Sequence, residues 1–108
     1  MATALKNARV KPSAATLTTL YTCPASTSTV VSSITICNLS ATPTTFRVVL
    51  LPLGAAVADA DYIYYDVTIA GNDTFIFTGG ITMVATDVIQ VYATLATLSF
   101  NLYGQENS

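Results

Sequence analysis

The strongest constraint on the fold is the stretch from Tyr62 to Phe77, YIYYDVTIAGNDTFIF, because its residues alternate between two faces. Over 62–69 this alternation has the period of a β-strand with one drier and one wetter side. Residues 70–73 break the pattern, and the two phenylalanines restore it. We therefore predict two strands, 62–69 and 74–78, that pair as a hairpin through a three-residue loop, Ala70–Asn72. The predicted inward-facing residues are Ile63, Tyr65, Val67, Ile69, Phe75 and Phe77.

Similar short runs, rich in β-branched and aromatic residues, recur along the chain at intervals of about 8–12 residues. The further predicted strands are 16–23, 29–38, 44–51, 81–84, 88–94 and 97–103. In 44–51 we expect Arg47 to face outward, and Val49 and Leu51 suggest that this strand is partly covered on both sides. We expect 88–94 and 97–103 to pair as a hairpin whose inward-facing residues are Ile89, Val91, Ala93, Leu98, Phe100 and Leu102. A longer connection lies at 52–60, where a short helix at 55–58 is one alternative. Strands and helices do not alternate, so a parallel sheet is not predicted. The pattern predicts an all-β fold, an antiparallel β-sandwich or jelly-roll-like barrel of about seven to eight short strands.

A chain of 108 residues has the size of one domain. We divide it into a basic N-terminal arm at 1–13, a β-sandwich domain at 14–104 and a C-terminal tail at 105–108. The arm carries Lys6, Arg9 and Lys11, whereas the remainder holds one arginine against six acidic residues. One interpretation is that the arm contacts an acidic patch on a neighbouring subunit. The alternative is a solvated, disordered terminus.

The chain is unusually poor in charge. Only 9% of its residues are charged, against about 25% in a typical soluble domain. Threonine occurs 18 times, so the surface is rich in hydroxyl groups. We interpret this surface as one that partners cover, which favours a homo-oligomer; the alternative is a stable monomer.

Charge and hydropathy also argue against two classes of partner. The acidic body and an arm with only three cations argue against nucleic-acid binding. No run of 18 apolar residues occurs, so we expect no membrane-spanning helix.

The residue types argue against common catalytic and metal sites. The chain has no histidine, which rules out a Ser-His-Asp triad or a histidine-bearing metal site. Asp59, Asp61 and Asp66 lack the spacing of an EF-hand, so we interpret them as turn residues. We therefore predict no catalytic residues, no cofactor and no metal, and a protein that is not an enzyme.

Cys23 and Cys37 are the two cysteines of the chain. If 16–23 and 29–38 form a hairpin, the cysteines lie roughly 27 Å apart, at ~3.4 Å per residue. A disulfide needs Cα atoms within about 7 Å, so we expect two free thiols.

Tyr62 and Tyr64 alternate with the predicted inward-facing residues and are therefore expected on the outer face. Tyrosine rings stack on sugars, which would make the pair a carbohydrate-binding platform. Tyrosine is also enriched in protein interfaces, because it offers area and a hydroxyl at low entropy cost. We favour an interface for these two residues.

Four segments carry a resemblance to a known group of proteins: LYTCPASTSTVVSSITICN, TTFRVVLLPLGA, DYIYYDVTIAGNDTF and DVIQVYATLATLSFNLYGQE. Their most specific parts are Tyr21-Thr22-Cys23-Pro24, Thr45-Phe46-Arg47, Tyr64-Tyr65-Asp66-Val67 and Asn72-Asp73-Thr74-Phe75. Over about residues 16–106, the chain resembles small virion structural proteins of tailed phages, including phages of cyanobacteria. The resemblance implies a β-sandwich module in a capsid or tail, without catalysis.

Together these observations predict a non-enzymatic virion structural protein that is assembled in the host cytoplasm. The leading hypothesis is a capsid decoration (cement) protein that stabilises the head shell through oligomeric packing. Its partners would be the major capsid protein or other virion subunits. Alternatives are a tail, baseplate or fibre-attachment component, or a carbohydrate-binding module in host adsorption. The predicted partner contacts are Lys6, Arg9, Lys11, Tyr62 and Tyr64.

Overall fold

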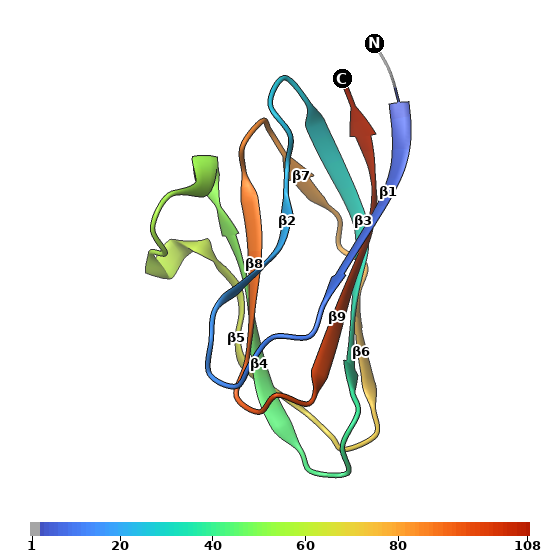
Figure 1. The fold of residues 1–108 in the computed structure, drawn as a ribbon, viewed down its shortest axis with the longest axis vertical. Coiled ribbons are helices and arrows are strands. Elements are labelled where there is room, and N and C mark those ends of the chain that lie inside the picture. The colour runs from blue at the N-terminus through green and yellow to red at the C-terminus, as the bar shows by residue number, and fades with distance from the viewer. Residues whose placement is uncertain (1–2) are drawn as a thin grey trace.

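The computed structural model of the protein describes residues 3–108, and this part of the chain is built from nine strands (Figure 1). Two 3₁₀ turns, η1 and η2, interrupt the connection between β4 and β5. The strands are β1 Thr3–Val10, β2 Thr18–Thr22, β3 Ser28–Asn38, β4 Thr44–Leu51, β5 Tyr62–Ile69, β6 Thr74–Phe77, β7 Ile81–Met83, β8 Val88–Ala93 and β9 Leu98–Asn107. The turns are η1 Pro52–Gly54 and η2 Asp59–Asp61.

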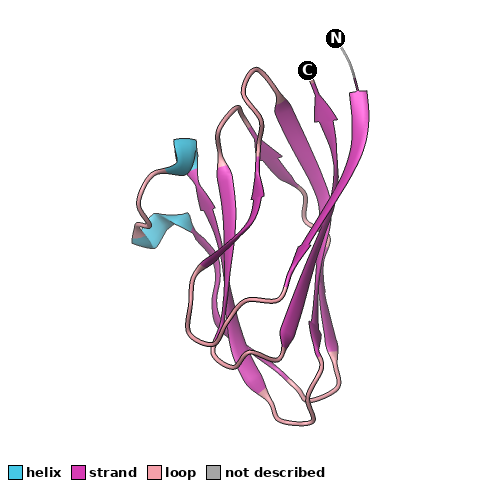
Figure 2. Ribbon diagram, in the orientation of Figure 1, coloured by secondary structure: helices cyan, strands magenta, loops and turns pink. Residues whose placement is uncertain are grey.

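The strands form two antiparallel sheets that face each other as a sandwich (Figure 2). One sheet has five strands in the order β1-β9-β3-β6, with β7 also paired to β3. The other has four strands in the order β2-β8-β4-β5. The predicted antiparallel β-sandwich is therefore confirmed, with β1 as a strand that the sequence did not indicate.

The strand pairs are nested one inside another. β4 pairs with β5, β3 with β6, β2 with β8 and β1 with β9. The chain thus resembles one long hairpin that is rolled up, so that β9 also pairs with β3 and β8 with β4. Only β4 and β5 are both consecutive in sequence and paired with each other.

The predicted hairpin of 62–69 with 74–78 is therefore wrong. β5 pairs with β4 in the four-stranded sheet, whereas β6 pairs with β3 in the five-stranded sheet. The pairings assumed for 16–23 with 29–38, and for 88–94 with 97–103, are wrong for the same reason. Each of these connections crosses from one sheet to the other, a step that local alternation does not reveal.

The core lies between the two sheets and follows the predicted inward faces of most strands. Alternate residues of β8 and β9 are fully buried, as expected, and Phe46 and Phe100 are the largest of the fully buried side chains. The residues at or below 1% exposure are Cys23, Val31, Ile34, Ile36, Phe46, Val48, Val49, Ile89, Val91, Ala93, Leu98, Phe100, Leu102 and Thr29.

Strand β5 departs from the predicted alternation at a bulge. Phe46 pairs with Val67 and Val48 pairs with Tyr64, so β5 uses one residue more than β4 between these pairs. Asp66, inside the bulge, has φ of +51°. The extra residue turns Tyr65 outward, where it is 57% exposed. The prediction that Tyr65 belongs to the core is therefore wrong.

The N-terminal segment differs from the predicted arm. Within it, Thr3–Val10 is strand β1, which pairs with β9 along its whole length. Ala8 and Val10 pack against the core, and the backbone bonds to β9 hold the remainder. At the other end, β9 continues to Asn107, so residues 105–107 of the predicted tail also belong to the sheet. Residues 1 and 2 lie outside the described part.

The connection at 52–61 holds no helix at 55–58; it is irregular between η1 and η2. The buried Asp87 carboxylate accepts hydrogen bonds from the backbone N–H groups of Leu53 and Val84. η1 thereby lies against β8, and η2 contacts β4. Val49 and Leu51 on the outer side of β4 are buried, in agreement with the prediction that this strand is covered on both sides.

Both cysteines are free: Cys23 is buried and Cys37 is half-buried. The Cys23 thiol lies 3.3 Å from the Thr29 hydroxyl. Within residues 3–108, no helix is long and apolar enough to cross a bilayer.

Tyr21 fixes the end of the sandwich at which β2, β3 and β9 meet. Its hydroxyl hydrogen-bonds with the carboxylate of Glu106 and lies 2.9 Å from the Thr29 hydroxyl. Burial, together with the bond to Glu106, raises the pKa of Tyr21 from 10.0 to about 12. Ionisation of this phenol is thus harder in the folded protein than in the unfolded chain.

The raised pKa of Tyr21 predicts a specific alkaline weakness. The protonated Tyr21 hydroxyl stabilises the folded protein fully below pH 10, and this stabilisation is lost as the pH rises from 10 to about 12. A shift of this size corresponds to about 2–3 kcal/mol. Urea unfolding at pH 8 and pH 11.5 should therefore show a steeper loss for the wild type than for Tyr21→Phe. Parallel losses in the two proteins would contradict this account of the site.

Candidate functional site

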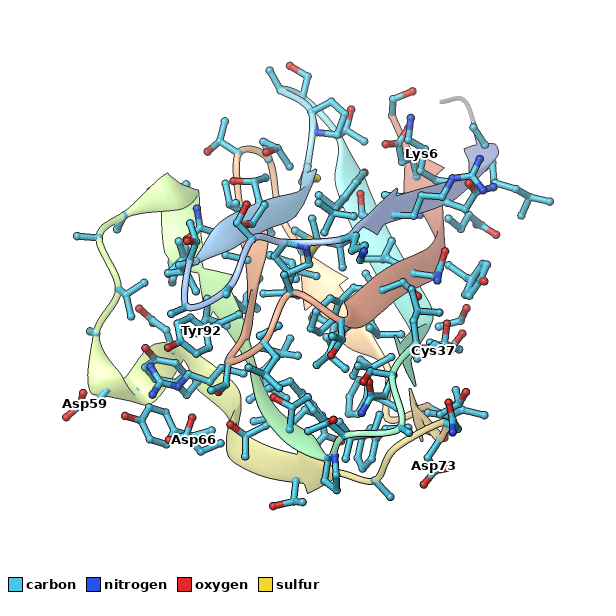
Figure 3. The ribbon with its side chains drawn as sticks, turned by 60° about the horizontal axis from the view of Figure 1, so that its bottom comes forward. Lys6, Cys37, Asp59, Asp66, Asp73 and Tyr92 are labelled. Atoms are coloured by element: carbon cyan, nitrogen blue, oxygen red, sulfur yellow. The ribbon has the colours of Figure 1, made fainter. Side chains whose placement is uncertain are left out.

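The outer face of the four-stranded sheet carries a cluster of aromatic and charged side chains. Strand β4 contributes Arg47, β5 contributes Tyr65 and Asp66, and β8 contributes Tyr92, which pairs with Arg47 in the β4–β8 register. We call these four residues the arginine cluster. Figure 3 shows Asp66 and Tyr92 on the same side of the sandwich.

Arg47 is held from three sides. Its Nε donates to Asp66 Oδ1 at 2.6 Å, and its Nη2 donates to Oδ2 at 3.3 Å. The guanidinium carbon lies 4.2 Å from the centroid of the Tyr65 ring and 4.3 Å from that of Tyr92. The hydrogen bonds that Arg47 donates to Asp66 raise the pKa of Arg47 further above its ordinary value. The bulge at Asp66 makes this arrangement possible, because it places both Tyr65 and the carboxylate beside the arginine.

Replacing Arg47 with alanine should lower the free energy of unfolding by about 1–2 kcal/mol, because an exposed ion pair and two exposed cation–π contacts are lost together. Lys11→Ala is the matched control, since it removes a cation that has no bonded partner and should change the stability by less than about 0.5 kcal/mol. Urea denaturation at pH 7 measures both. Equal stability of the two variants would mean that the cluster does not stabilise the fold.

A cavity of about 340 Å³ adjoins the arginine cluster and is lined by Asp59, Tyr62 and Tyr65. The rings of Tyr62 and Tyr65 are nearly perpendicular, at 87°, with centroids 4.9 Å apart. Asp59 begins η2 and is exposed. We call this site the Asp59 cavity. Its walls are thus two aromatic rings and one carboxylate.

A second cavity of about 340 Å³ lies on the outer face of the five-stranded sheet, across β1, β9 and β3. Its lining is more apolar and includes Leu5 and Val30, which are 87% and 47% exposed. The other lining residues are Ser32, Gly104 and Gln105.

The structure separates the basic residues that were predicted as partner contacts. In the β1–β9 register, Lys6 is opposite Gly104 and Arg9 is opposite Asn101. These positions alternate with respect to the buried residues of β9, so Lys6 and Arg9 lie on opposite faces of the strand. Lys11 follows the end of β1 and is exposed. Their role in partner contact stays a prediction.

Of the two predicted tyrosines, only Tyr62 lies on the outer face. Tyr64 turns inward beyond the bulge, with its ring 5.2 Å from that of Phe75 and 5.6 Å from that of Phe77. The surface pair is therefore Tyr62 with Tyr65. The sequence predicted the outward position of Arg47 but not its two ring partners. Tyr65 is turned outward by the bulge in β5, and Tyr92 lies beside Arg47 because β8 pairs with β4.

The outer faces of both sheets carry side chains that suit contacts with a partner. Within residues 3–108, no group of three or more histidine, cysteine, aspartate or glutamate side chains is arranged to hold a metal ion. One face of the Tyr65 ring is covered by the Arg47 guanidinium. Arginine and tyrosine are residues enriched in protein interfaces, and here they are already fixed in place.

The comparisons with known proteins concern the fold. No protein-family model matches the chain, and no curated protein matches it. A chain in the "Acidic stable capsid structure of Helicobacter pylori bacteriophage KHP30" has a similar structure, with a TM-score of 0.56 and 12% sequence identity. The match covers 98% of this chain and 87% of that chain. The two proteins therefore share the sandwich over nearly their whole lengths.

Proposed function

We propose that the protein is a structural component of a phage virion, and more specifically a decoration protein that binds the capsid shell. The observation that carries this proposal is the shared fold with a chain of a phage capsid, over 98% of the length. The resemblance of the sequence to small virion proteins of tailed phages supports the same function independently of that fold match.

The strand order supports the proposal. Nested pairs that are rolled into two sheets, 1-9-3-6 and 2-8-4-5, are what a jelly roll contains, and we interpret the fold as one. Jelly rolls recur in viral capsid and lectin domains. Such a module binds through its outer faces and loops, which here carry the arginine cluster and the apolar cavity at Leu5.

We further propose that the protein is non-enzymatic and acts by contact with major capsid protein or other virion subunits. The low charge of the chain, 9%, suits a surface that neighbours cover. Arg47 and its tyrosines form a preordered patch, and preordered side chains lose little entropy on binding.

The test uses particles of the phage that encodes the protein, made with and without its gene. Particles without the protein are expected to release DNA at a lower temperature, and purified protein should restore the original profile when added back. Identical release curves for the two kinds of particle would contradict a stabilising role. Immunogold labelling separates the alternative: label on the tail alone would support a tail, baseplate or fibre-attachment component.

A further inference from the structure

Within residues 3–108, some charged side chains have a hydrogen-bond or ion-pair partner in the same chain and others have none. Arg47 pairs with Asp66. The remaining bonded carboxylates accept from backbone N–H groups or from Tyr21: these are Asp61, Asp73, Asp87 and Glu106. The Asp59 carboxylate has no hydrogen bond or ion pair in the described part, and neither do the side chains of Lys6, Arg9 and Lys11.

The Asp59 cavity repeats the chemistry that surrounds Arg47. In the arginine cluster, one carboxylate and two tyrosine rings enclose a cation. In the adjoining cavity, Asp59, Tyr62 and Tyr65 again supply one carboxylate and two rings, but no cation of the described chain enters it. A carboxylate beside aromatic faces attracts an ammonium or guanidinium group. The Asp59 cavity is therefore suited to bind a cationic group of another molecule.

The side chain of Lys6 cannot fill this cavity in its own molecule. β1 and η2 lie at opposite sides of the sandwich (Figure 1), and Figure 3 likewise shows Lys6 and Asp59 far apart. Lys6 is exposed and belongs to β1, an edge strand. A second copy, however, can present its β1 to the Asp59 cavity of the first.

We propose that two copies of this chain bind head to tail, with Lys6 on β1 of one copy in the Asp59 cavity of the other. The contact is heterologous, so repeated copies form a closed ring or a chain. This inference specifies the homo-oligomer expected of a virion component, but it concerns the free protein and is tested in solution.

The test compares the self-association of the wild type with that of two variants, measured by sedimentation velocity at 50 mM and 500 mM salt. Asp59→Lys removes the acceptor, and Lys6→Ala removes the donor. Each is expected to raise the dissociation constant at least about tenfold, which is 1.4 kcal/mol. Higher salt should weaken the wild type, because the contact pairs exposed charges.

A mixture of the two variants tests the head-to-tail geometry. Each variant keeps the half of the contact that the other lacks. An equimolar mixture should therefore form a one-to-one heterodimer and stop there, since the heterodimer has no second intact contact. A symmetric interface predicts no such rescue.

Asp73→Lys is the matched control, because it makes the same change in net charge at an exposed carboxylate remote from Asp59 (Figure 3). It should associate as the wild type does. The inference is overturned if the wild type stays monomeric up to millimolar concentration, if Asp59→Lys behaves like Asp73→Lys, or if the mixture forms no heterodimer. Glycan-array binding that Asp59→Lys abolishes, in a monomeric wild type, would assign the cavity to a sugar instead. A failure in solution, with the protein still present in particles, would reject this contact and leave the proposed function standing.

Discussion

Replacement of Phe46 with alanine is expected to lower the free energy of unfolding by about 3–5 kcal/mol, the usual cost of removing a buried phenylalanine. Phe46 is fully buried at the centre of the sandwich. Its ring lies 5.3 Å from that of Phe75 and 6.4 Å from that of Phe100, both in the facing sheet, and 5.9 Å from that of Tyr64. The substitution therefore opens a cavity between the sheets and removes ring contacts that join them.

Chemical denaturation with an aromatic control measures this effect. Tyr103→Ala is the control, because Tyr103 is 43% exposed on the outer face of β9 and its loss leaves no internal cavity. The control should lose about 0.5 kcal/mol or less. A loss below about 1 kcal/mol for Phe46→Ala would contradict the position of this ring between the two sheets.

Replacement of Asn38 with alanine is expected to lower the free energy of unfolding by about 2–4 kcal/mol. Asn38 is 2% exposed at the end of β3. Its Nδ2 donates to the carbonyls of Thr42 and Ala70, and its Oδ1 accepts from the N–H of Ser40. One side chain thus joins two loops that belong to different strand connections, and alanine leaves all three backbone groups without these partners.

The loss at Asn38 should be accompanied by local loosening. In the native protein the N–H of Asn72 donates to the carbonyl of Ser40, next to the Asn38 bonds. Amide exchange at Asn72 should therefore quicken in Asn38→Ala. Asn7→Ala serves as the control, because Asn7 is exposed on β1. Unchanged stability together with unchanged exchange at Asn72 would show that the side chain does not join the loops.

The positions of most strands follow from the sequence, because alternation is a local property. The buried set of β8 and β9 agrees with the predicted faces for this reason. The pairing of strands is not local. Within the described residues, β4 and β5 are the one pair of consecutive strands that pair with each other. The predicted hairpins therefore had the wrong pairing partners, although the strands themselves were predicted correctly.

Two irregular elements also escaped prediction. The bulge at Asp66 moves Tyr65 out and Tyr64 in, and any residue that tolerates a positive φ can sit in such a bulge. Strand β1 escaped because only Ala8 and Val10 pack against the core. An edge strand held mainly by backbone bonds leaves little trace in the order of apolar residues.

Only part of the candidate site could be predicted from the sequence. Alternation predicts the outward positions of Arg47 and Tyr62, and the sequence shows the cluster of basic residues near the N-terminus. The Asp59 cavity depends on the bulge and on η2 together, since these bring residues of a loop and a strand to one place. Neither the bulge nor η2 follows from the alternation of apolar and polar residues along a strand.

The central claim, that the protein is a virion component that decorates the capsid, is tested most directly by its copy number in purified particles. Quantitative mass spectrometry against the major capsid protein gives this ratio. The account predicts a ratio near one to one, as expected for a protein that covers the shell. Absence of the chain from purified particles would contradict the claim.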